Sequence, residues 1–406
     1  MASNKFNHNL VKWALLFFAF FPLIPNPLKG LPVILLAGIA FYIFRFKKIN
    51  LKIFIGCSFL FFLYAFSLIY TSNTDHGLKI LETSLSILFI PFSFSLIIPH
   101  LQVKKDIQTL FAKLFVLSTT IFSVIGIAAI ILDTKTPLYK DYYSDRFRRI
   151  IQALPLLGQH PIYASLFLAL AIIFTVYLLR NIQKNKPFII LLILSLLINS
   201  TFLLMLSSRG VILSLVIIML IFLLFFTKLT TRFKVILLLF FLASIISMFT
   251  FNRRMREFFI VKSFEVVNPN YSTTYRVNIL KCSVELIKNN WITGYGVGDV
   301  QDQLNQCYTT KSELLLKKTY NSHNQYLDVW LKTGIIGFLY FSFFIFFLIM
   351  KSIKNKKFLP LAIILLYSTG FLFENILSRR SGVILFYFLI CFFIAFNNKR
   401  ETTNSK

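Results

Sequence analysis

A histidine in a polar segment has the surroundings that a general base needs. His323 lies in the stretch Asn321-Ser322-His323-Asn324-Gln325, shortly before a long apolar run. Ser322 and Gln325 have the spacing of a capping box, so we expect Ser322 to cap a helix that begins at His323. The positive end of a helix disfavours the imidazolium, which leaves the ring neutral and able to accept a proton. His323 is therefore the candidate general base, with a capping or interfacial role as the plainer alternative.

Two arginines in other polar segments have the chemistry to bind an anionic substrate group. Arg209 lies in a short turn between two apolar runs, and Arg276 lies near the start of a helical pattern that extends to about Asn290. A guanidinium is always charged, and its planar fork binds two phosphate oxygens at once. Each residue also has a plainer interpretation, Arg209 as an interfacial anchor and Arg276 as a solvated surface charge.

Five further residues close to the ends of apolar runs are secondary candidates: His160, Glu374, Arg379, Arg380 and Tyr326. His160 precedes one apolar run and Glu374 follows another. Arg379 and Arg380 suit an acidic glycan, but they suit lipid headgroups equally well. Tyr326 is expected to pack against neighbouring residues rather than to stack on a substrate.

Two of the four cysteines lie in one polar segment. Cys282 and Cys307 form either a disulfide or two unpaired thiols, because a sequence cannot place their Cβ atoms. Cys57 and Cys391 lie inside apolar runs and are predicted to be small core residues.

The acidic residues do not gather in the way that metal ligands usually do. The nearest groupings are the stretches 141–145 and 299–302, and neither contains a close acidic pair. Divalent cations in enzymes are typically held by several carboxylate oxygens. We therefore predict no metal and no other cofactor.

Composition decides the class of protein to which these residues belong. Of 406 residues, 57% are hydrophobic and only 14% are charged, against about 25% charged residues in a soluble domain. The net charge of +28 would suggest nucleic acid in a soluble protein, but the basic residues stand in short clusters between apolar runs, as topology signals do. The composition predicts an all-α polytopic membrane protein that does not bind nucleic acid.

The apolar runs predict about twelve transmembrane helices. They fall at 11–26, 28–44, 51–70, 78–99, 107–132, 161–179, 188–206, 211–227, 235–251, 333–350, 358–374 and 382–396. Residues 1–251 would hold the first nine spans and a smaller outer loop at 133–160. Residues 252–332 would form one large, partly helical outer loop, and residues 333–406 the last three spans and a tail. The first two runs also suit a re-entrant pair, because prolines interrupt them.

The distribution of lysine and arginine predicts the orientation. Basic residues concentrate in the short segments that share a side with both termini if the chain crosses twelve times. The positive-inside rule then places both termini in the cytoplasm and the large loop on the opposite side. The first apolar run lacks a small-residue cleavage site after it, so we interpret it as a membrane helix rather than a removable signal peptide.

The large loop contains one clear helical pattern. Val277, Leu280, Val284 and Ile287 recur at spacings of three and four and predict one apolar face. Such an amphipathic helix would lie on the membrane or on the transmembrane bundle. The alternate glycines at 294, 296 and 298 that follow it indicate tight turns and not a nucleotide-binding loop, because no strand precedes them.

Several of these motifs together resemble the O-antigen ligase and O-antigen polymerase family of bacterial inner membranes. The resemblance rests on four pieces in this order, and it covers roughly residues 160–380. The pieces are Ser208-Arg209-Gly210, Tyr275-Arg276, Gly294-Tyr295-Gly296-Val297-Gly298, and His323-Asn324-Gln325-Tyr326-Leu327 with Gly334-Ile335-Ile336-Gly337.

The resemblance implies a membrane-embedded glycosyltransferase of the bacterial inner membrane, with its large loop in the periplasm. Such proteins take a glycan from a polyprenyl (undecaprenyl) pyrophosphate carrier and join it to an acceptor hydroxyl. In the ligases the acceptor is lipid A–core; in the polymerases it is another carrier-linked repeat. The family's functional arginines would be Arg209 and Arg276, and its functional histidine His323.

The residue chemistry agrees with such a reaction. A pyrophosphate leaves as a stabilised anion, so the protein must neutralise its charge, as arginine does, and must deprotonate the acceptor hydroxyl, as histidine does near neutral pH. We therefore predict a metal-independent ligase. The alternatives are a polymerase of the same family, a glycolipid or anion transporter, and a membrane scaffold without catalytic activity.

Overall fold

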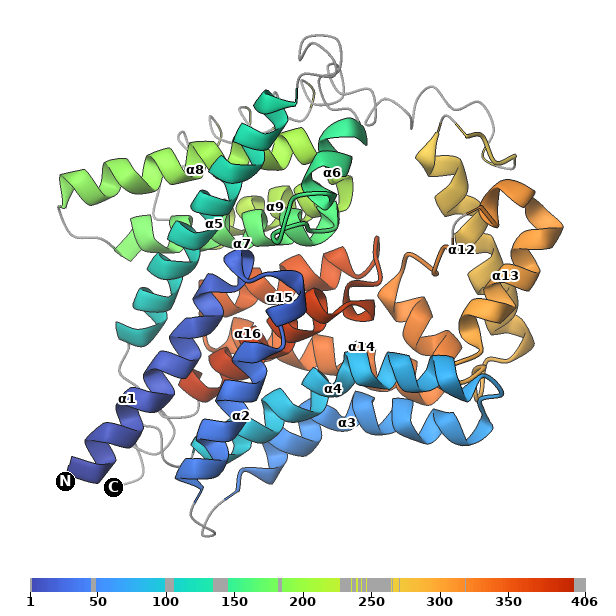
Figure 1. Ribbon diagram of the computed structural model, residues 1–406, viewed down its shortest axis with the longest axis horizontal. Coiled ribbons are helices and arrows are strands. Elements are labelled where there is room, and N and C mark those ends of the chain that lie inside the picture. Colours follow the sequence, from blue (N-terminus) through green and yellow to red (C-terminus); the bar gives the residue numbers. More distant parts are fainter. Residues whose placement is uncertain are drawn as a thin grey trace.

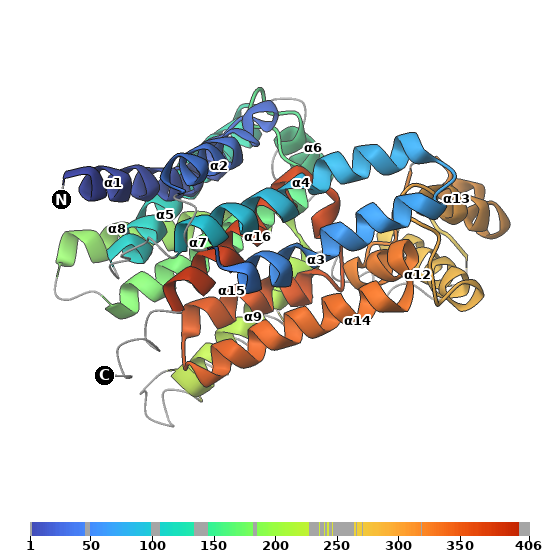
Figure 2. The same cartoon turned by 90° about the horizontal axis from the view of Figure 1, so that it is seen from below.

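Figure 1 shows the computed structural model of the chain, and Figure 2 shows it from below. Apart from a few single positions between 235 and 269, the structure describes residues 2–44, 49–98, 106–133, 145–181, 185–226, 271–317 and 319–397.

The described residues form helices and connecting loops, and they contain no strand. The α-helices are α1 (Ala2–Phe17), α2 (Leu31–Ile43), α3 (Leu51–Ser67), α4 (Thr74–Ile97), α5 (Asp106–Leu132), α6 (Asp145–Gln152), α7 (Pro161–Asn181), α8 (Lys186–Leu206), α9 (Arg209–Ile221), α12 (Ser272–Asn289), α13 (Val300–Lys311), α14 (Gln325–Lys354), α15 (Phe358–Gly370) and α16 (Arg380–Asn397). The predicted all-α class is therefore confirmed.

The number of long apolar helices is smaller than predicted. Seven are long and apolar enough to cross a membrane, and three shorter apolar helices accompany them. The first predicted run is divided between α1 and a 3-10 helix, η1 (Phe18–Leu23), because Pro22 lies within it. The run 235–251 falls mostly outside the described residues. Twelve spans are thus not reached in the part of the chain that the structure describes.

The centre of the bundle is formed by α7 and α16. In α7, 83% of the apolar window is buried, against 33–50% for the other six long helices. Small residues such as Ala164, Ser165 and Ala169 are fully buried there and let neighbouring helices approach closely. Most of α16 is buried as well, with Phe386 and Phe388 at 0% exposure. The outer helices keep apolar faces such as Ile34 and Phe343 exposed, as lipid contact requires.

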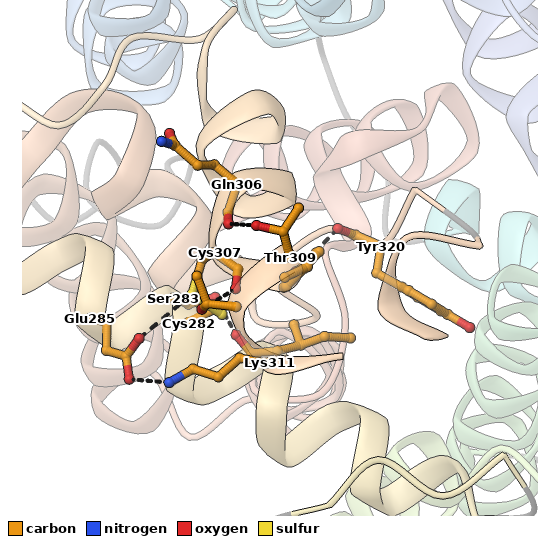
Figure 3. Close-up of a disulfide and its surroundings, with 11 residues drawn as sticks. Cys282, Ser283, Glu285, Gln306, Cys307, Thr309, Lys311 and Tyr320 are labelled. Carbon is orange, nitrogen blue, oxygen red and sulfur yellow. Dashed lines mark hydrogen bonds and ion pairs between the residues drawn. A yellow bond between two sulfur atoms is a disulfide. The ribbon is translucent and has the colours of Figure 1, made fainter. Parts of the chain in front are cut away.

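Helices α12 and α13 lie together at one end of the bundle (Figures 1 and 2). Cys282 of α12 and Cys307 of α13 are joined by a disulfide (Figure 3). Glu285 of α12 also pairs with Lys311 of α13 at 2.8 Å. The sequence left open whether these cysteines form a disulfide or remain two thiols, and in the structure they form the disulfide. The start of α1 and the end of α16 lie at the opposite end of the bundle.

The predicted apolar face of α12 is buried only in part. Ile287 is buried, but Leu280 and Val284 are exposed, at 45% and 39%, and Ile279, Cys282 and Leu286 are buried instead. The buried side is the one that packs on α13 and α14 in a second hydrophobic core. Periodicity alone could not choose between two adjacent apolar stripes, because the disulfide and the partner helices decide which stripe faces inward.

The disulfide leads to a stability prediction. Replacing Cys282 and Cys307 with serine should lower the stability of the α12–α13 unit, because a bridge across 25 residues restricts the unfolded chain by up to about 3 kcal/mol. Thermal denaturation of the purified protein with and without reductant measures this. Reductant should lower the melting temperature of the native chain and leave that of the double variant unchanged. A native melting temperature that reductant does not change would contradict the prediction.

The glycine stretch after α12 ties the large loop to α14. Tyr295 and Gly296 donate backbone hydrogen bonds to the carbonyls of Leu331 and Lys332, at 2.7 and 3.1 Å. Gly294 and Gly296 have positive φ, and backbone atoms crowd the positions that their Cβ atoms would take. Gly334 has φ 64° and kinks α14 where the Ile292 carbonyl approaches it. Gly294 and Gly296 therefore serve tight turns, as predicted, and Gly334 allows a close backbone contact at the kink of α14.

Helix α14 begins at Gln325, earlier than the span predicted from residue 333. Its first turns contain a buried ion pair, with Lys332 Nζ 2.6 Å from Asp328 Oδ2. Lys332 also lies 5.5 Å from the centre of the Tyr64 ring. Hydropathy did not place these charges within a long apolar helix, because the apolar run predicted for this span begins only at residue 333.

Candidate active site

The candidate site is built around the loop between α15 and α16, residues 371–379, which we call the Glu374 loop. Glu374 and Asn375 are only 8% and 1% exposed. Backbone hydrogen bonds to Tyr367 and Gly370 hold the start of the loop against the end of α15. The sequence placed Glu374 among the secondary candidates. In the structure it is the residue that His323 and Arg276 share.

His323 lies in a turn directly before α14 and not within the helix. Asn324 is the N-cap, since its Oδ1 accepts hydrogen bonds from the backbone N–H groups of Tyr326 and Leu327. His323 has φ 47°, in the left-handed region. The prediction that Ser322 caps the helix is therefore wrong. Asparagine caps a helix as well as serine does, and Ser322 bonds to Asn375 instead.

A carboxylate orients the His323 ring. Nδ1 of His323 lies 2.9 Å from Oε1 of Glu374, and the two side chains are 24% and 11% exposed. Because an ionised carboxylate only accepts hydrogen bonds, this contact assigns the ring proton to Nδ1 and leaves the Nε2 lone pair available. The orienting group is thus a glutamate, in place of the helix end that the sequence suggested.

Glu374 is ionised at neutral pH. Burial by itself raises the pKa of Glu374, but the hydrogen bond from His323 and the positive charges of His323 and Arg276 outweigh burial and lower this pKa to about 2. A buried carboxylate keeps its charge only where hydrogen bonds and opposite charges compensate its desolvation.

Arg276 contacts the other oxygen of the same carboxylate. Its Nη2 lies 3.8 Å from Glu374 Oε2, and 43% of the side chain is exposed. The residue lies in the first turns of α12. A contact this long, to a guanidinium that is partly exposed, contributes little stability. Arg276 therefore combines a loose tie to the buried carboxylate with a guanidinium that solvent reaches.

Arg209 joins the start of α9 to the start of α12. Its Nη1 donates to Thr273 Oγ1 at 3.0 Å, and its Nη2 donates to Ser272 Oγ at 2.8 Å. The neighbouring Gly210 packs on the Glu374 loop, where a Cβ would lie 2.8 Å from Phe373 Cβ. Arg276 and His323, which are far apart in the sequence, therefore meet at Glu374, and Arg209 is linked to them through the first turn of α12.

Of the other secondary candidates, His160 lies near this cluster, where the charges of Arg379, Glu374 and His323 act on its ring. Arg380 points elsewhere, since its Nη2 pairs with Glu82 Oε1 at 2.8 Å. Tyr326 packs against Phe341 and Phe371, as expected from the sequence.

The polar residues that fix the position of His323 were not identified as site residues from the sequence. Gln325 is fully buried; its N–H donates to the Phe371 carbonyl at 2.8 Å, and its Oε1 accepts from the N–H of Leu377 at 2.7 Å. Asn375 donates to Ser322 Oγ at 3.0 Å. The capping-box spacing had indicated Ser322 and Gln325, but their partners are in the Glu374 loop.

The only group of potential metal ligands within the described ranges is formed by Cys282, Glu285 and Cys307. Both sulfurs are bonded to each other, so neither is a thiolate that binds metal. The single carboxylate of the candidate site is already held by a histidine and an arginine. Metal independence of the reaction stays a prediction.

Comparison with known proteins finds a family similarity for part of the chain. Residues 194–342 match the family model described as O-antigen ligase. This range contains Arg209, Arg276 and His323, whereas His160 and Glu374 lie outside it. An uncharacterized protein of Haemophilus influenzae is 33% identical over 150 residues, which cover 33% of this chain and 37% of that protein. The match thus spans little more than a third of the relative's length. With its seven helices of spanning length, the chain is a multi-pass membrane protein whose residues 194–342 are similar to the O-antigen ligase family.

Proposed function

We propose that the chain is an O-antigen ligase-type glycosyltransferase. It would transfer a glycan from an undecaprenyl pyrophosphate carrier to a hydroxyl of lipid A–core. One observation carries the proposal: Glu374 binds His323 through one carboxylate oxygen and contacts Arg276 through the other. The buried Glu374 carboxylate thus holds both the candidate base, His323, and the candidate phosphate-binding cation, Arg276.

In the proposed reaction, the acceptor hydroxyl attacks the anomeric carbon of the carrier-linked glycan. Nε2 of His323 takes the hydroxyl proton while the new glycosidic bond forms. The bond between the anomeric carbon and the pyrophosphate oxygen breaks, and the undecaprenyl pyrophosphate leaves with the electron pair. Glu374 keeps the ring in the required tautomer and stabilises the imidazolium, as a carboxylate does in a hydrolase triad.

The two arginines would bind the donor. Arg276 is the more exposed of the two, and its N–H groups would donate hydrogen bonds to the pyrophosphate oxygens. Arg209 anchors the first turn of α12 and adds a second positive charge. Guanidinium groups supply the charge neutralisation that other glycosyltransferases obtain from a divalent metal. The arrangement therefore agrees with a metal-independent transfer.

We also propose that the site faces the periplasm of a bacterial inner membrane and that both termini are cytoplasmic. Residues 252–332 would form the periplasmic loop, between a first part of the bundle at 1–251 and a last part at 333–406. Two observations support this orientation. The start of α1 and the end of α16 lie away from α12 and α13, and the Cys282–Cys307 disulfide suits an oxidising compartment.

Purified protein in nanodiscs, given an undecaprenyl pyrophosphate-linked glycan and lipid A–core, tests the proposal. A ligase should form the covalent glycan–core product in the presence of EDTA. Products in which carrier-linked repeats grow longer would assign the polymerase reaction instead. Movement of intact glycolipid across liposome membranes, with no new bond, would overturn the enzymatic proposal.

A further inference from the structure

We infer that His160 is a further substrate-binding residue, whose neutral imidazole donates one hydrogen bond through Nε2–H to a sugar hydroxyl of the acceptor. The inference rests on the proposed function and extends it to a helix outside the matched family range. It assigns the acceptor to α7 and the Glu374 loop, while the donor pyrophosphate is assigned to α9 and α12.

His160 lies against the Glu374 loop, directly before α7. Tyr163, one turn further on, donates from its hydroxyl to the Ile376 carbonyl of this loop at 3.2 Å. The rings of His160 and Tyr163 are 6.1 Å apart. The start of α7 therefore packs on the same loop that carries Glu374, and His160 accompanies it.

Buried polar contacts hold the chain at this position. Gln159, next to His160, is 2% exposed and donates from Nε2 to Asn26 Oδ1. Its Oε1 accepts from Ser381 at 3.5 Å, and the buried Lys29 donates to the same serine hydroxyl at 3.0 Å. Contacts of Gln159 with the segment 26–29 and with the start of α16 thus fix the chain next to His160, as a preorganised binding group requires.

One nitrogen of the His160 ring is shielded from solvent and makes no hydrogen bond to the described part of the protein. Nδ1 is buried and has no hydrogen-bond partner in the described part of the chain. In a neutral imidazole one nitrogen is a donor and the other an acceptor. A buried N–H without a partner is rarer than an unused acceptor, so the proton belongs on Nε2. The part of the ring that solvent reaches then presents a donor.

The surroundings keep this ring uncharged. Burial is the largest cause that lowers the pKa of His160; together with the positive charges of Arg379, Arg148 and His323, and against the opposing charge of Glu374, it brings this pKa to about 4. Above that pH the ring is neutral, so it does not change charge where the enzyme works. A neutral N–H is a suitable hydrogen-bond donor to the oxygen of a sugar hydroxyl.

Two isosteric variants test the inference. In His160→Gln the amide nitrogen takes about the place of Nε2, whereas in His160→Asn it takes about the place of Nδ1. We expect His160→Gln to keep the native KM for lipid A–core within about threefold, and His160→Asn and His160→Ala to raise it about tenfold, as for one lost hydrogen bond. The KM for the donor and the pH profile of kcat should not change.

His76 supplies a matched control, because its ring is also partly buried but its Nδ1 contacts the Gly298 carbonyl at 2.8 Å, in another part of the protein. His76→Gln should leave the acceptor KM unchanged. An unaltered acceptor KM in His160→Ala, or equal losses in His160→Gln and His160→Ala, would overturn the inference while the transferase proposal stands.

Binding of delipidated core oligosaccharide to the native protein and to the His160 variants distinguishes failure of the transferase proposal from failure of the His160 inference. If the native protein transfers no glycan but binds the oligosaccharide more weakly after His160→Ala, the transferase proposal fails and the assigned contact stands. If it neither transfers nor binds, both fail.

Discussion

Replacing His323 with alanine should lower the rate of glycan transfer by about 10²- to 10⁴-fold, the usual contribution of a general base. The loss should appear in kcat, since the ring acts on the proton that moves in the transition state. Initial rates of covalent product formation in nanodiscs measure it. His76→Ala serves as the control, because His76 lies away from the Glu374 loop and contacts Gly298.

Glu374→Gln should cause a loss of similar size while the protein still folds and inserts. The amide has the shape of the carboxylate but can donate to Nδ1, which would place the ring proton on Nε2 and remove the base. The loop's other contacts, such as the bond between Asn375 and Ser322, remain in this variant. Full activity in either His323→Ala or Glu374→Gln would exclude the base mechanism.

The second large effect is expected at Arg276. Arg276→Ala should lower kcat/KM for the lipid-linked donor by about 10²- to 10³-fold, because a cation aimed at the developing pyrophosphate charge is lost. Arg276→Lys should restore only part of the activity, since an ammonium cannot bind two phosphate oxygens in a planar fork. Donor-dependent initial rates at saturating acceptor provide the measurement.

Lys281→Ala is the matched control for Arg276, because Lys281 is an exposed basic residue of the same helix that has no contact with Glu374 among those described. Its removal should leave the donor kinetics unchanged. Equal losses in Arg276→Ala and Lys281→Ala would indicate a diffuse electrostatic effect on the whole helix rather than a specific binding role.

The class of protein and the identity of the main candidates were accessible from the sequence. Hydropathy and length identify membrane helices one at a time, since each span satisfies its own backbone hydrogen bonds. His323, Arg209 and Arg276 stood out by residue type and local motif. The turn glycines were also interpreted correctly, because the conformations that they permit are a local property of the backbone.

Only the tertiary structure decided how these residues are arranged. Glu374 contacts a histidine 51 positions away, and Asn324 replaced Ser322 as the helix cap because Ser322 bonds to Asn375 in the Glu374 loop. The buried face of α12 followed from its disulfide and its partner helices. Such contacts join segments that are distant in the chain, and periodicity and motif spacing report only on neighbours within a few turns. The sequence alone therefore determined which groups were available for chemistry, and packing determined which of them meet.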